Sequence, residues 1–339
     1  DANESPFALG EAIRGALARE LAKALADVAL HRYPDPSARA VREALAADLG
    51  VSPEEILVSN GSDEAIQLLE IAVAGPDAAV LAPVPTFVMY EIGARVVGER
   101  FAGVPLTADF ALDLPAVEAA LRRERPRLVF LAWPNNPTGN LFRAEAVERI
   151  LRACLGEACE ALVVVDEAYF PYAGRTFIPR LRDFPNLVVL RTLSKIGLAG
   201  IRLGVLVANR AVVDEVNKAR LPYNVNALSQ AAARVVLAHG DLVREQAATI
   251  LAERERLLGA LAGMSGVQAY PSDANFFLIR TERPSAAVAQ GLLARGVVVR
   301  DFGRAPFLEN CLRVTVGTRQ ENEAFLAALA HTLSDGRAA

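Results

Sequence analysis

Two polar segments, each following an apolar run, carry residue types that can do covalent and acid–base chemistry. Lys195 ends the segment Arg191-Thr192-Leu193-Ser194-Lys195, and a further arginine follows it seven residues later. A partly desolvated lysine near other cations has a lowered pKa and suits Schiff-base formation. Asp166 closes the run 162–165, where a buried carboxylate is costly unless it is paired, so it could hold a heterocyclic nitrogen protonated. Tyr169, three residues on, could reach an oxygen of the same cofactor.

Two further polar turns could bind an anion and present an amide. Gly61-Ser62-Asp63 follows the run 56–59 and opens a helix, where backbone N–H groups and the helix dipole favour a phosphate. Asn135-Asn136 stands between prolines after the run 128–132, in a stiff turn. The ordinary interpretations of the four segments are a helix cap, a proline turn, a metal-binding or Walker-B-like aspartate and a solvated lysine. The lack of a GxxxxGK[ST] segment weakens the Walker-B alternative.

The order and spacing of the four segments favour one cofactor. Asn136, Asp166 and Lys195 are thirty and twenty-nine residues apart, about one strand–helix–strand step each. Together the segments supply a Schiff-base lysine, a carboxylate for a pyridinium nitrogen and phosphate donors, which is what pyridoxal 5'-phosphate requires. A nicotinamide dehydrogenase is disfavoured, because no GxGxxG segment follows a strand.

The elements that must position these segments follow from hydrophobic patterning. Short runs rich in Val and Leu, apolar on both faces, predict strands of a parallel sheet, and amphipathic stretches between them predict helices. This alternation predicts a doubly wound α/β fold, in which ligands bind beyond the carboxyl ends of the strands. The expected strands are 79–82, 128–132, 162–165, 187–190 and 204–207, and the expected helices are 63–72, 114–123 and 144–155.

The pattern changes after about residue 235. A long charged helix is expected over 242–261, followed by short strands over 276–280, 297–300 and 312–316. We therefore expect a large domain over 30–235 and a smaller α/β domain formed by 1–29 and 236–339. The first thirty residues are expected to be helical and to pack on the smaller domain.

Composition limits the expected partners and compartment. Hydrophobic residues make up 53% of the chain, the formal net charge is -4 and no basic block occurs, so nucleic acid is not an expected partner. No apolar run reaches the roughly 18 residues of a membrane span and no signal-peptide pattern is found, so the cytoplasm is expected and a membrane is not. Cys154, Cys159 and Cys311 are interpreted as reduced core thiols, and no metal site is expected.

Longer strings extend the pattern over nearly the whole chain. They are Asp1-Ala-Asn-Glu4, Tyr33-Pro-Asp-Pro36, Gly61-Ser-Asp-Glu64, Pro85-Thr-Phe-Val-Met-Tyr90, Asn135-Asn-Pro-Thr-Gly139, Val165-Asp-Glu-Ala-Tyr169, Thr192-Leu-Ser-Lys195, Pro222-Tyr-Asn-Val-Asn226, Ala274-Asn-Phe276 and Leu312-Arg-Val-Thr-Val-Gly-Thr318. In these strings the chain resembles the fold-type-I aminotransferases, and within them the histidinol-phosphate aminotransferase family. The resemblance implies a pyridoxal-phosphate transferase fold, with a mostly parallel sheet between helices in a large domain and a smaller α/β domain beside it.

The resemblance also assigns roles to matched residues. Lys195 would carry the cofactor as a Schiff base and Asp166 would pair with its ring nitrogen. Asn136 and Tyr169 would bind the ring hydroxyl, and Phe87 would stack on the ring. The cofactor phosphate would be held by Ser62, Asp63, Thr192, Ser194 and Arg202, and by Tyr33 of the neighbouring subunit, which implies a homodimer. On the substrate side, Arg313 would bind the carboxylate, Arg300 is a candidate for the substrate phosphate, and the remaining lining residues would be Asn3, Tyr223 and Asn275.

The implied reaction moves the amino group of histidinol phosphate to 2-oxoglutarate, with Lys195 shuttling the proton at the substrate Cα. Three departures from the family pattern bear on substrate identity: Phe87 replaces a common Tyr, Ser5 replaces an aromatic residue of some members, and the spacing from Lys195 to Arg202 is one residue shorter than in many relatives. The alternatives that stay open are an aromatic or broad-range aminotransferase, a phosphothreonine decarboxylase and a non-catalytic binding domain.

Overall fold

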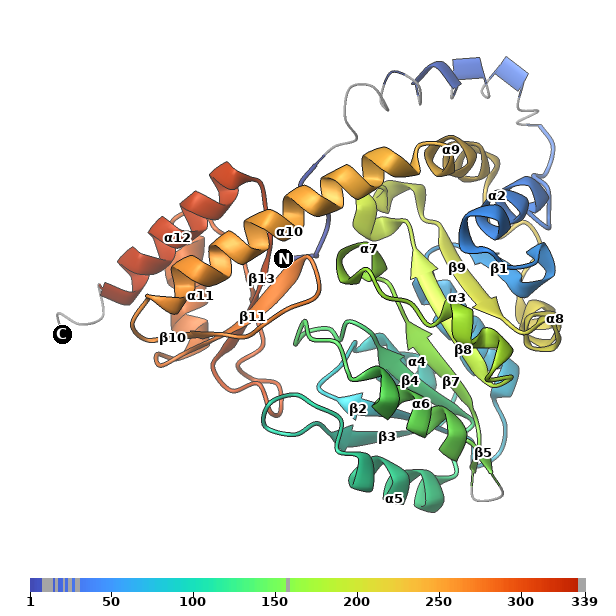
Figure 1. Cartoon of the computed structure of the whole chain (residues 1–339), viewed down its shortest axis with the longest axis horizontal. Helices are drawn as coiled ribbons and strands as arrows, with labels where there is room; N and C mark the ends of the chain where they lie inside the picture. Colours follow the sequence, from blue (N-terminus) through green and yellow to red (C-terminus); the bar gives the residue numbers. More distant parts are fainter. Residues whose placement is uncertain are drawn as a thin grey trace.

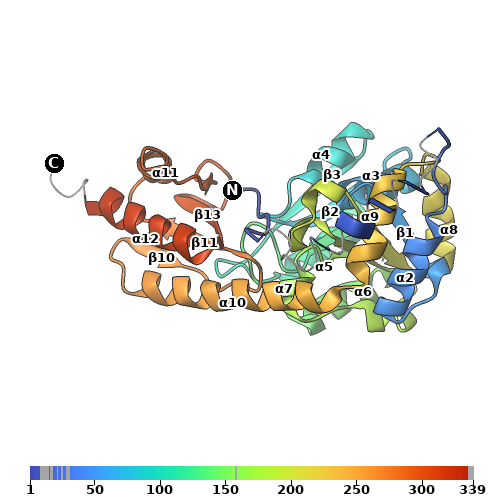
Figure 2. The same ribbon diagram turned by 90° about the horizontal axis from the view of Figure 1, so that it is seen from above.

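The computed structural model describes residues 1–7, 15, 18–20, 22–23, 26–27, 31–156 and 159–334. Its ribbon forms two parts, each built around one sheet, with helix α10 (Gly240–Ala262) running from one part to the other (Figures 1 and 2). The N-terminus lies at the junction of the two parts in both views.

The larger sheet has seven strands in the order β1-β9-β8-β7-β4-β2-β3. Strand β9 runs antiparallel to its neighbours β1 and β8, and the remaining pairs are parallel, as the mostly parallel sheet predicted from sequence requires. The central strands are buried on both faces, which explains their Val and Leu content. The strands are β1 (Ile56–Ser59), β2 (Ala79–Val84), β3 (Arg100–Pro105), β4 (Leu128–Ala132), β7 (Leu162–Asp166), β8 (Leu187–Thr192) and β9 (Gly204–Ala208).

Helices cover both faces of this sheet. One face packs against α3 (Ser62–Val73), α4 (Met89–Val96) and α8 (Arg210–Ala219). The other packs against α2 (Arg39–Leu49), α5 (Leu114–Glu124), α6 (Ala144–Ala153) and α9 (Ala227–Leu237). The shorter elements are η1 (Pro53–Glu55), the hairpin β5 (Leu155–Gly156) and β6 (Cys159–Glu160), α7 (Phe170–Ala173), η2 (Ile178–Arg182), η3 (Ser194–Ile196) and η4 (Ala199–Ile201). The strands and helices expected between residues 63 and 207 are confirmed, with ends that differ by a few residues.

The smaller sheet has the order β10-β11-β13-β12 and is antiparallel throughout. Its elements are β10 (Val267–Ala269), β11 (Phe276–Thr281), β12 (Arg300–Asp301) and β13 (Cys311–Thr315), and it packs with α10, α11 (Ser285–Leu293) and α12 (Arg319–Ser334). The boundaries 30–235 and 236–339 with 1–29 remain our proposal for the two domains.

One expected strand of the smaller sheet was wrong. Only Arg300 of the run 297–300 pairs with β13, and the three valines before it are outside any strand. The cause is the end of α11: Gly296 has φ 78°, and the N–H of Val297 bonds back to the carbonyl of Leu292 at 3.0 Å. A backbone N–H that caps a helix cannot join a strand ladder.

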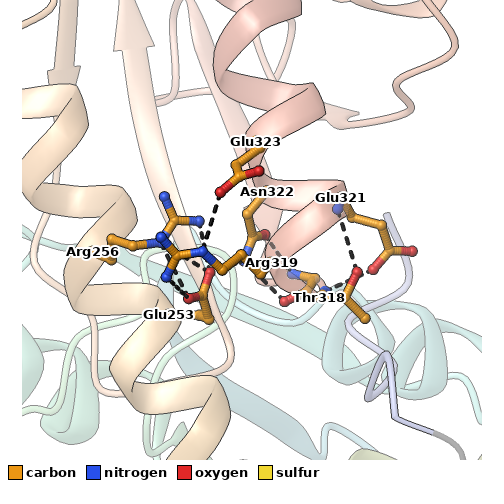
Figure 3. A network of polar contacts seen from close by, with 8 residues as sticks. Glu253, Arg256, Thr318, Arg319, Glu321, Asn322 and Glu323 are labelled. Atoms are coloured by element: carbon orange, nitrogen blue, oxygen red, sulfur yellow. Dashed lines mark hydrogen bonds and ion pairs between the residues drawn. The ribbon is translucent and has the colours of Figure 1, made fainter.

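A polar network fastens α12 to the middle of α10 (Figure 3). Glu253 of α10 accepts hydrogen bonds from Arg256 at 2.7 Å and from Asn322 at 3.0 Å, and lies 3.5 Å from Arg319. Thr318 precedes α12, and its backbone N–H donates to Glu321 at 2.7 Å. These bonds join α10, which precedes the smaller sheet in the sequence, to α12, which follows it. They therefore hold together the two helices that pack on this sheet.

The first seven residues form an irregular strap, so the expected helix does not begin at residue 1. Phe7 packs on the core of the smaller sheet. Those of residues 8–30 that the structure describes are helical. The predicted packing of this segment on the smaller domain involves residues outside the described ones, so it stays a prediction. No helix among the described residues is long and apolar enough to span a membrane, and no group of three metal-ligating side chains occurs among them. The three cysteines are free and buried, as expected of core thiols.

An acidic pair is buried between α3 and the start of β3. Glu70 is fully buried and Glu99 is 6% exposed, and neither carboxylate has a side-chain hydrogen-bond partner within the described part of the chain. Burial, and then the charge of Glu99, raises the pKa of Glu70 from 4.5 to about 8. The folded protein therefore holds this proton more tightly than the unfolded chain does.

We expect Glu70→Gln to stabilise the protein in a pH-dependent way. Because the folded pKa is raised, the parent loses stability as the pH rises from about 4.5 to about 8, whereas glutamine cannot ionise. The gain should be close to zero at pH 4.5 and should reach up to about 4 kcal/mol at pH 8.5. Urea unfolding at three pH values measures it, with Glu43→Gln on the exposed face of α2 as the control. An equal gain in the free energy of unfolding at all three pH values would contradict a raised pKa of Glu70 in the folded protein.

Candidate active site

A cavity of about 190 Å³ lies at the carboxyl ends of β4, β7 and β8, next to the start of α3. The structure brings most of the predicted site residues to its walls: Asn3, Ser62, Asp63, Phe87, Asn136, Asp166, Tyr169, Thr192, Ser194, Lys195, Arg202 and Arg313. A larger cavity of about 510 Å³ has mostly apolar walls and shares only Thr192 with this set. The chemistry therefore belongs to the smaller cavity.

Lys195 is the one lysine of the chain that is partly buried. The chain has three lysines, and the other two, Lys23 and Lys218, are exposed. Lys195 sits in η3, directly after β8, and its Nζ donates to the carbonyl of Ala2 at 3.1 Å. Burial, and then the nearby charge of Arg313, lowers the pKa of Lys195. A neutral amine is a nucleophile and a base, so this position suits covalent and proton-transfer chemistry.

Asp166 is the last residue of β7 and is 5% exposed. Its Oδ1 accepts the N–H of Ala168 at 3.1 Å and its Oδ2 accepts the hydroxyl of Tyr90 at 2.8 Å. Burial raises the pKa of Asp166 to about 6, against the lowering effect of these two hydrogen bonds. No cation forms an ion pair with it among the residues that the structure describes. A cationic ring nitrogen in the cavity would supply the missing charge.

Tyr169 and the N-terminal strap meet at the mouth of the cavity. Asn3 is buried, and its side-chain amide donates to the hydroxyl of Tyr169 at 3.0 Å. Its Oδ1 accepts the hydroxyl of Thr315 in β13, and its carbonyl accepts the side-chain amide of Asn275. Burial raises the pKa of Tyr169 to about 12, so the hydroxyl stays protonated and can donate. The strap therefore ties the larger sheet's site to the smaller sheet.

The two asparagines of the proline turn have different tasks. Asn135 holds the turn in place, because it bonds to Thr138 within the turn and to Pro85 and Thr86 in the segment before α4. Asn136 faces the cavity, and its Oδ1 accepts a bond from Nη1 of Arg313 at 2.6 Å. The amide nitrogen of Asn136 is left to donate toward a ligand. Asn136 is the residue predicted from the sequence to contact the ligand. Its neighbour Asn135 cannot do so, because its side-chain amide already bonds to other residues of the protein.

The phosphate turn is built by close approach of two backbones. Gly61 has φ 80°, which favours glycine, and a Cβ there would meet the guanidinium of Arg202. A Cβ on Gly204 of β9 would collide with the carbonyl of Gly61. As the first residues of α3, Ser62 and Asp63 have N–H groups without an intrahelical acceptor. These groups can donate hydrogen bonds to an anion at this helix start.

Side-chain donors complete the anion site. The hydroxyl of Thr192 donates to Ser194 at 2.9 Å, and Nη1 of Arg202 lies 3.3 Å from the same oxygen. Arg202 also lies 3.8 Å from Asp63. The two 3₁₀ turns η3 and η4 bring Arg202 back to the site, so the shorter spacing from Lys195 does not remove it. These side chains and the turn 61–63 together could bind a phosphate.

Four predicted residues lie outside this cavity. Tyr33 is 78% exposed and stacks on Tyr223, with ring centroids 4.3 Å apart. Asn275 is fully buried and bonds to the strap rather than lining the cavity. The side chain of Arg300 is 60% exposed and its guanidinium lies 4.0 Å from the carboxylate of Asp1. Their predicted roles stay predictions, because each requires a substrate or a second subunit.

Two residues of the site were missed in the sequence. Tyr90 contacts Asp166 from α4, and the only signal was its position at the end of the string 85–90. The carbonyl of Ala2 accepts from Lys195, and no side-chain pattern can indicate a backbone contact. The donor set as a whole fits a cofactor that combines a phosphate, a protonated ring nitrogen and an aldehyde carbon, with the last within reach of Lys195.

Comparison with known proteins places the chain among well-described relatives. The family described as aminotransferase class I and II matches residues 1–329. The chain is 48% identical over 337 residues to histidinol-phosphate aminotransferase 1 of Ralstonia nicotianae, covering 99% of this chain and 89% of that protein. A structure of histidinol-phosphate aminotransferase from Sinorhizobium meliloti in complex with pyridoxal-5'-phosphate has a TM-score of 0.85 and 28% identity, covering 98% and 90% of the two chains. A structure of L-threonine-O-3-phosphate decarboxylase from Porphyromonas gingivalis has a TM-score of 0.83 and 26% identity, covering 97% and 98%.

Proposed function

This chain belongs to the class I and II aminotransferase family, among the histidinol-phosphate aminotransferases, and from that premise we propose that it transfers the amino group of histidinol phosphate to 2-oxoglutarate with pyridoxal 5'-phosphate as cofactor. The observation that carries the proposal is one cavity in which Lys195, Asp166 and Arg313 meet beside a phosphate turn. The products would be imidazole-acetol phosphate and glutamate, and biosynthesis would run the reaction in reverse.

The residues that would hold the cofactor follow from the donor set. The turn 61–63 with Thr192, Ser194 and Arg202 would hold its phosphate, and Asp166 would hold its ring nitrogen. Asn136 and Tyr169 would bind the ring hydroxyl, Phe87 would cover the ring face, and Lys195 would attach covalently. When bound, the cofactor supplies an electron sink for the pair of electrons released as the substrate Cα loses its proton.

The chain's own groups bind the substrate and move its proton. Arg313 is 8% exposed and oriented by Asn136, so it would bind the carboxylate of 2-oxoglutarate as a fixed cation, since histidinol phosphate has no carboxylate. Nζ of Lys195 would take the proton from the substrate Cα, which its lowered pKa favours. Arg300 would bind the substrate phosphate at the mouth. The backbone carbonyl of Ala2 accepts a bond from Lys195 and that of Asp1 accepts one from Arg313, so a substrate must displace these contacts.

We further propose that the enzyme works as a homodimer in the cytoplasm. Tyr33 and Leu221 are 78% and 73% exposed, which is unusual for such large apolar side chains. Covering them with a second copy would bring Tyr33 toward the partner's cofactor phosphate and Tyr223 toward its substrate.

Two other activities could use the same site. A decarboxylase would break the bond from Cα to the carboxylate instead of the bond to hydrogen, and a broad-range aminotransferase would accept aromatic donors. The identity to the Ralstonia enzyme, 48%, against 26% to the phosphothreonine decarboxylase, favours transamination of histidinol phosphate.

The test is a donor panel. The purified protein with added cofactor is mixed with 2-oxoglutarate and either histidinol phosphate, phenylalanine or O-phosphothreonine, and glutamate and carbon dioxide are measured. We expect glutamate from histidinol phosphate with a kcat/KM at least about 100-fold above that for phenylalanine, because phenylalanine lacks the phosphate that Arg300 would bind. Preference for phenylalanine would change the substrate, carbon dioxide from phosphothreonine would make the protein a decarboxylase, and no product from any donor would overturn the proposal.

A further inference from the structure

Tyr90 lies at the floor of the cavity, fully buried, and donates its hydroxyl to Oδ2 of Asp166 at 2.8 Å. We infer that Tyr90 is a positioning residue for the ring-nitrogen partner: it sets the orientation of the Asp166 carboxylate and keeps it an acceptor. This inference rests on the proposed cofactor and goes beyond the roles assigned so far.

The ring of Tyr90 is fixed on both sides. It stacks on Phe130 of β4 with centroids 4.5 Å apart and planes 4° apart, and it meets Phe87 edge-on at 5.6 Å. It is the second residue of α4. The turn before this helix is tied to Asn135, which bonds to Pro85 and Thr86. The hydroxyl therefore has one direction available, toward Asp166.

The effect on Asp166 follows from geometry. The hydroxyl of Tyr90 reaches Oδ2, and the N–H of Ala168 reaches Oδ1. Two donors on different oxygens prevent rotation of the carboxyl group and leave the remaining lone pairs for a ligand. Burial holds the pKa of Tyr90 well above its ordinary value, so the group stays a donor. A hydrogen bond to a charged carboxylate also opposes the effect of burial, which otherwise favours the neutral acid.

Tyr90 also links two of the cofactor contacts. Its ring supports Phe87, the residue proposed to cover the cofactor ring, while its hydroxyl holds Asp166 at the ring nitrogen. A packing role and a hydroxyl role can therefore be separated. Tyr90→Phe keeps the stack on Phe130 and the contact with Phe87, and it removes only the donor.

The experiment compares dissociation constants of two ligands. Wild type, Tyr90→Phe, Asp166→Ala and the double variant are titrated with pyridoxal 5'-phosphate and with its analogue that has a CH group in place of the ring nitrogen. We expect Tyr90→Phe to bind the cofactor about tenfold more weakly, the cost of losing a hydrogen bond to a charged group, and to bind the analogue as wild type does. In the Asp166→Ala background the substitution should have no further effect, because it acts through Asp166.

Tyr270→Phe is the matched control. Tyr270 accepts a bond from Nε of Arg280 at 3.0 Å in the smaller sheet, away from the cavity, so its loss should leave both constants unchanged. Unchanged cofactor binding in Tyr90→Phe, or equal weakening for cofactor and analogue, would overturn this inference alone, the second outcome meaning a packing defect. Wild type that binds neither ligand would overturn the proposed function as well.

Discussion

Lys195→Ala is expected to abolish covalent attachment of the cofactor and to lower turnover by at least roughly four orders of magnitude. The substitution removes the amine that forms the bond and the base that moves the substrate proton, two roles that each carry large rate factors. The fold should survive, because Nζ of Lys195 bonds only to the carbonyl of Ala2 within the described residues.

Borohydride reduction followed by mass spectrometry measures attachment directly. Reduction should fix one cofactor on wild type, in the peptide that contains Lys195, and none on the variant. The control is Lys218→Ala, since Lys218 is exposed on α8 and pairs with Glu215. With only three lysines in the chain, the labelled position is unambiguous. Attachment to the Lys195→Ala protein, or turnover near that of wild type, would refute the mechanism.

Asp166→Ala is expected to separate function from stability. Turnover should fall by about three orders of magnitude, because a neutral ring nitrogen is a poor electron sink, a charge effect of the size seen for preorganised electrostatic groups. The protein without cofactor should remain within about 2 kcal/mol of the parent at pH 7, because removal of the buried charge offsets the loss of the acceptor for the buried Tyr90 hydroxyl. Burial raises the pKa of Asp166 to about 6, so above that pH the folded parent holds a buried charge.

The sign of the pH dependence follows from the same shift. A carboxyl whose folded pKa is raised costs stability as the pH rises from 3.8 to about 6, and alanine removes that cost. Urea unfolding at pH 4 and pH 7, beside activity at pH 7, measures both effects. Asp214→Ala, at an exposed site on α8, is the control and should change neither. A large loss of stability with turnover intact would show that Asp166 is structural.

The two substitutions and the Tyr90 experiment test one chain of contacts. Tyr90 orients Asp166, Asp166 would hold the ring nitrogen, and Lys195 would hold the opposite end of the cofactor. The buried pair Glu70 and Glu99 stands apart from it, because neither lines the cavity. Among the described carboxyl groups whose pKa is raised, Asp166 lines the cavity, whereas Glu70, Glu99 and the Arg191 partner Glu167 do not.

The sequence by itself predicted most strands of the larger sheet, its mostly parallel arrangement and the positions where chemistry could occur. It did not predict β3 or the antiparallel direction of β9. Runs apolar on both faces must be buried on both faces, and parallel strands present their carboxyl ends at one edge. Asn136, Asp166 and Lys195 each follow such a run, so their convergence could be predicted without coordinates. The sequence also predicted the turn at Gly61, and the structure shows the positive φ that lets this turn form.

Only the tertiary structure decided which neighbours complete these groups. Tyr90 meets Asp166 across 76 residues of sequence, and Asn3 meets Thr315 across 312. No local period encodes such pairs, because they depend on how α4 and the strap pack on the sheets. The valines before Arg300 illustrate the same limit: their composition predicts a strand, but the N–H of Val297 caps α11 instead. Local patterning determines elements, whereas packing between distant elements decides which polar groups meet.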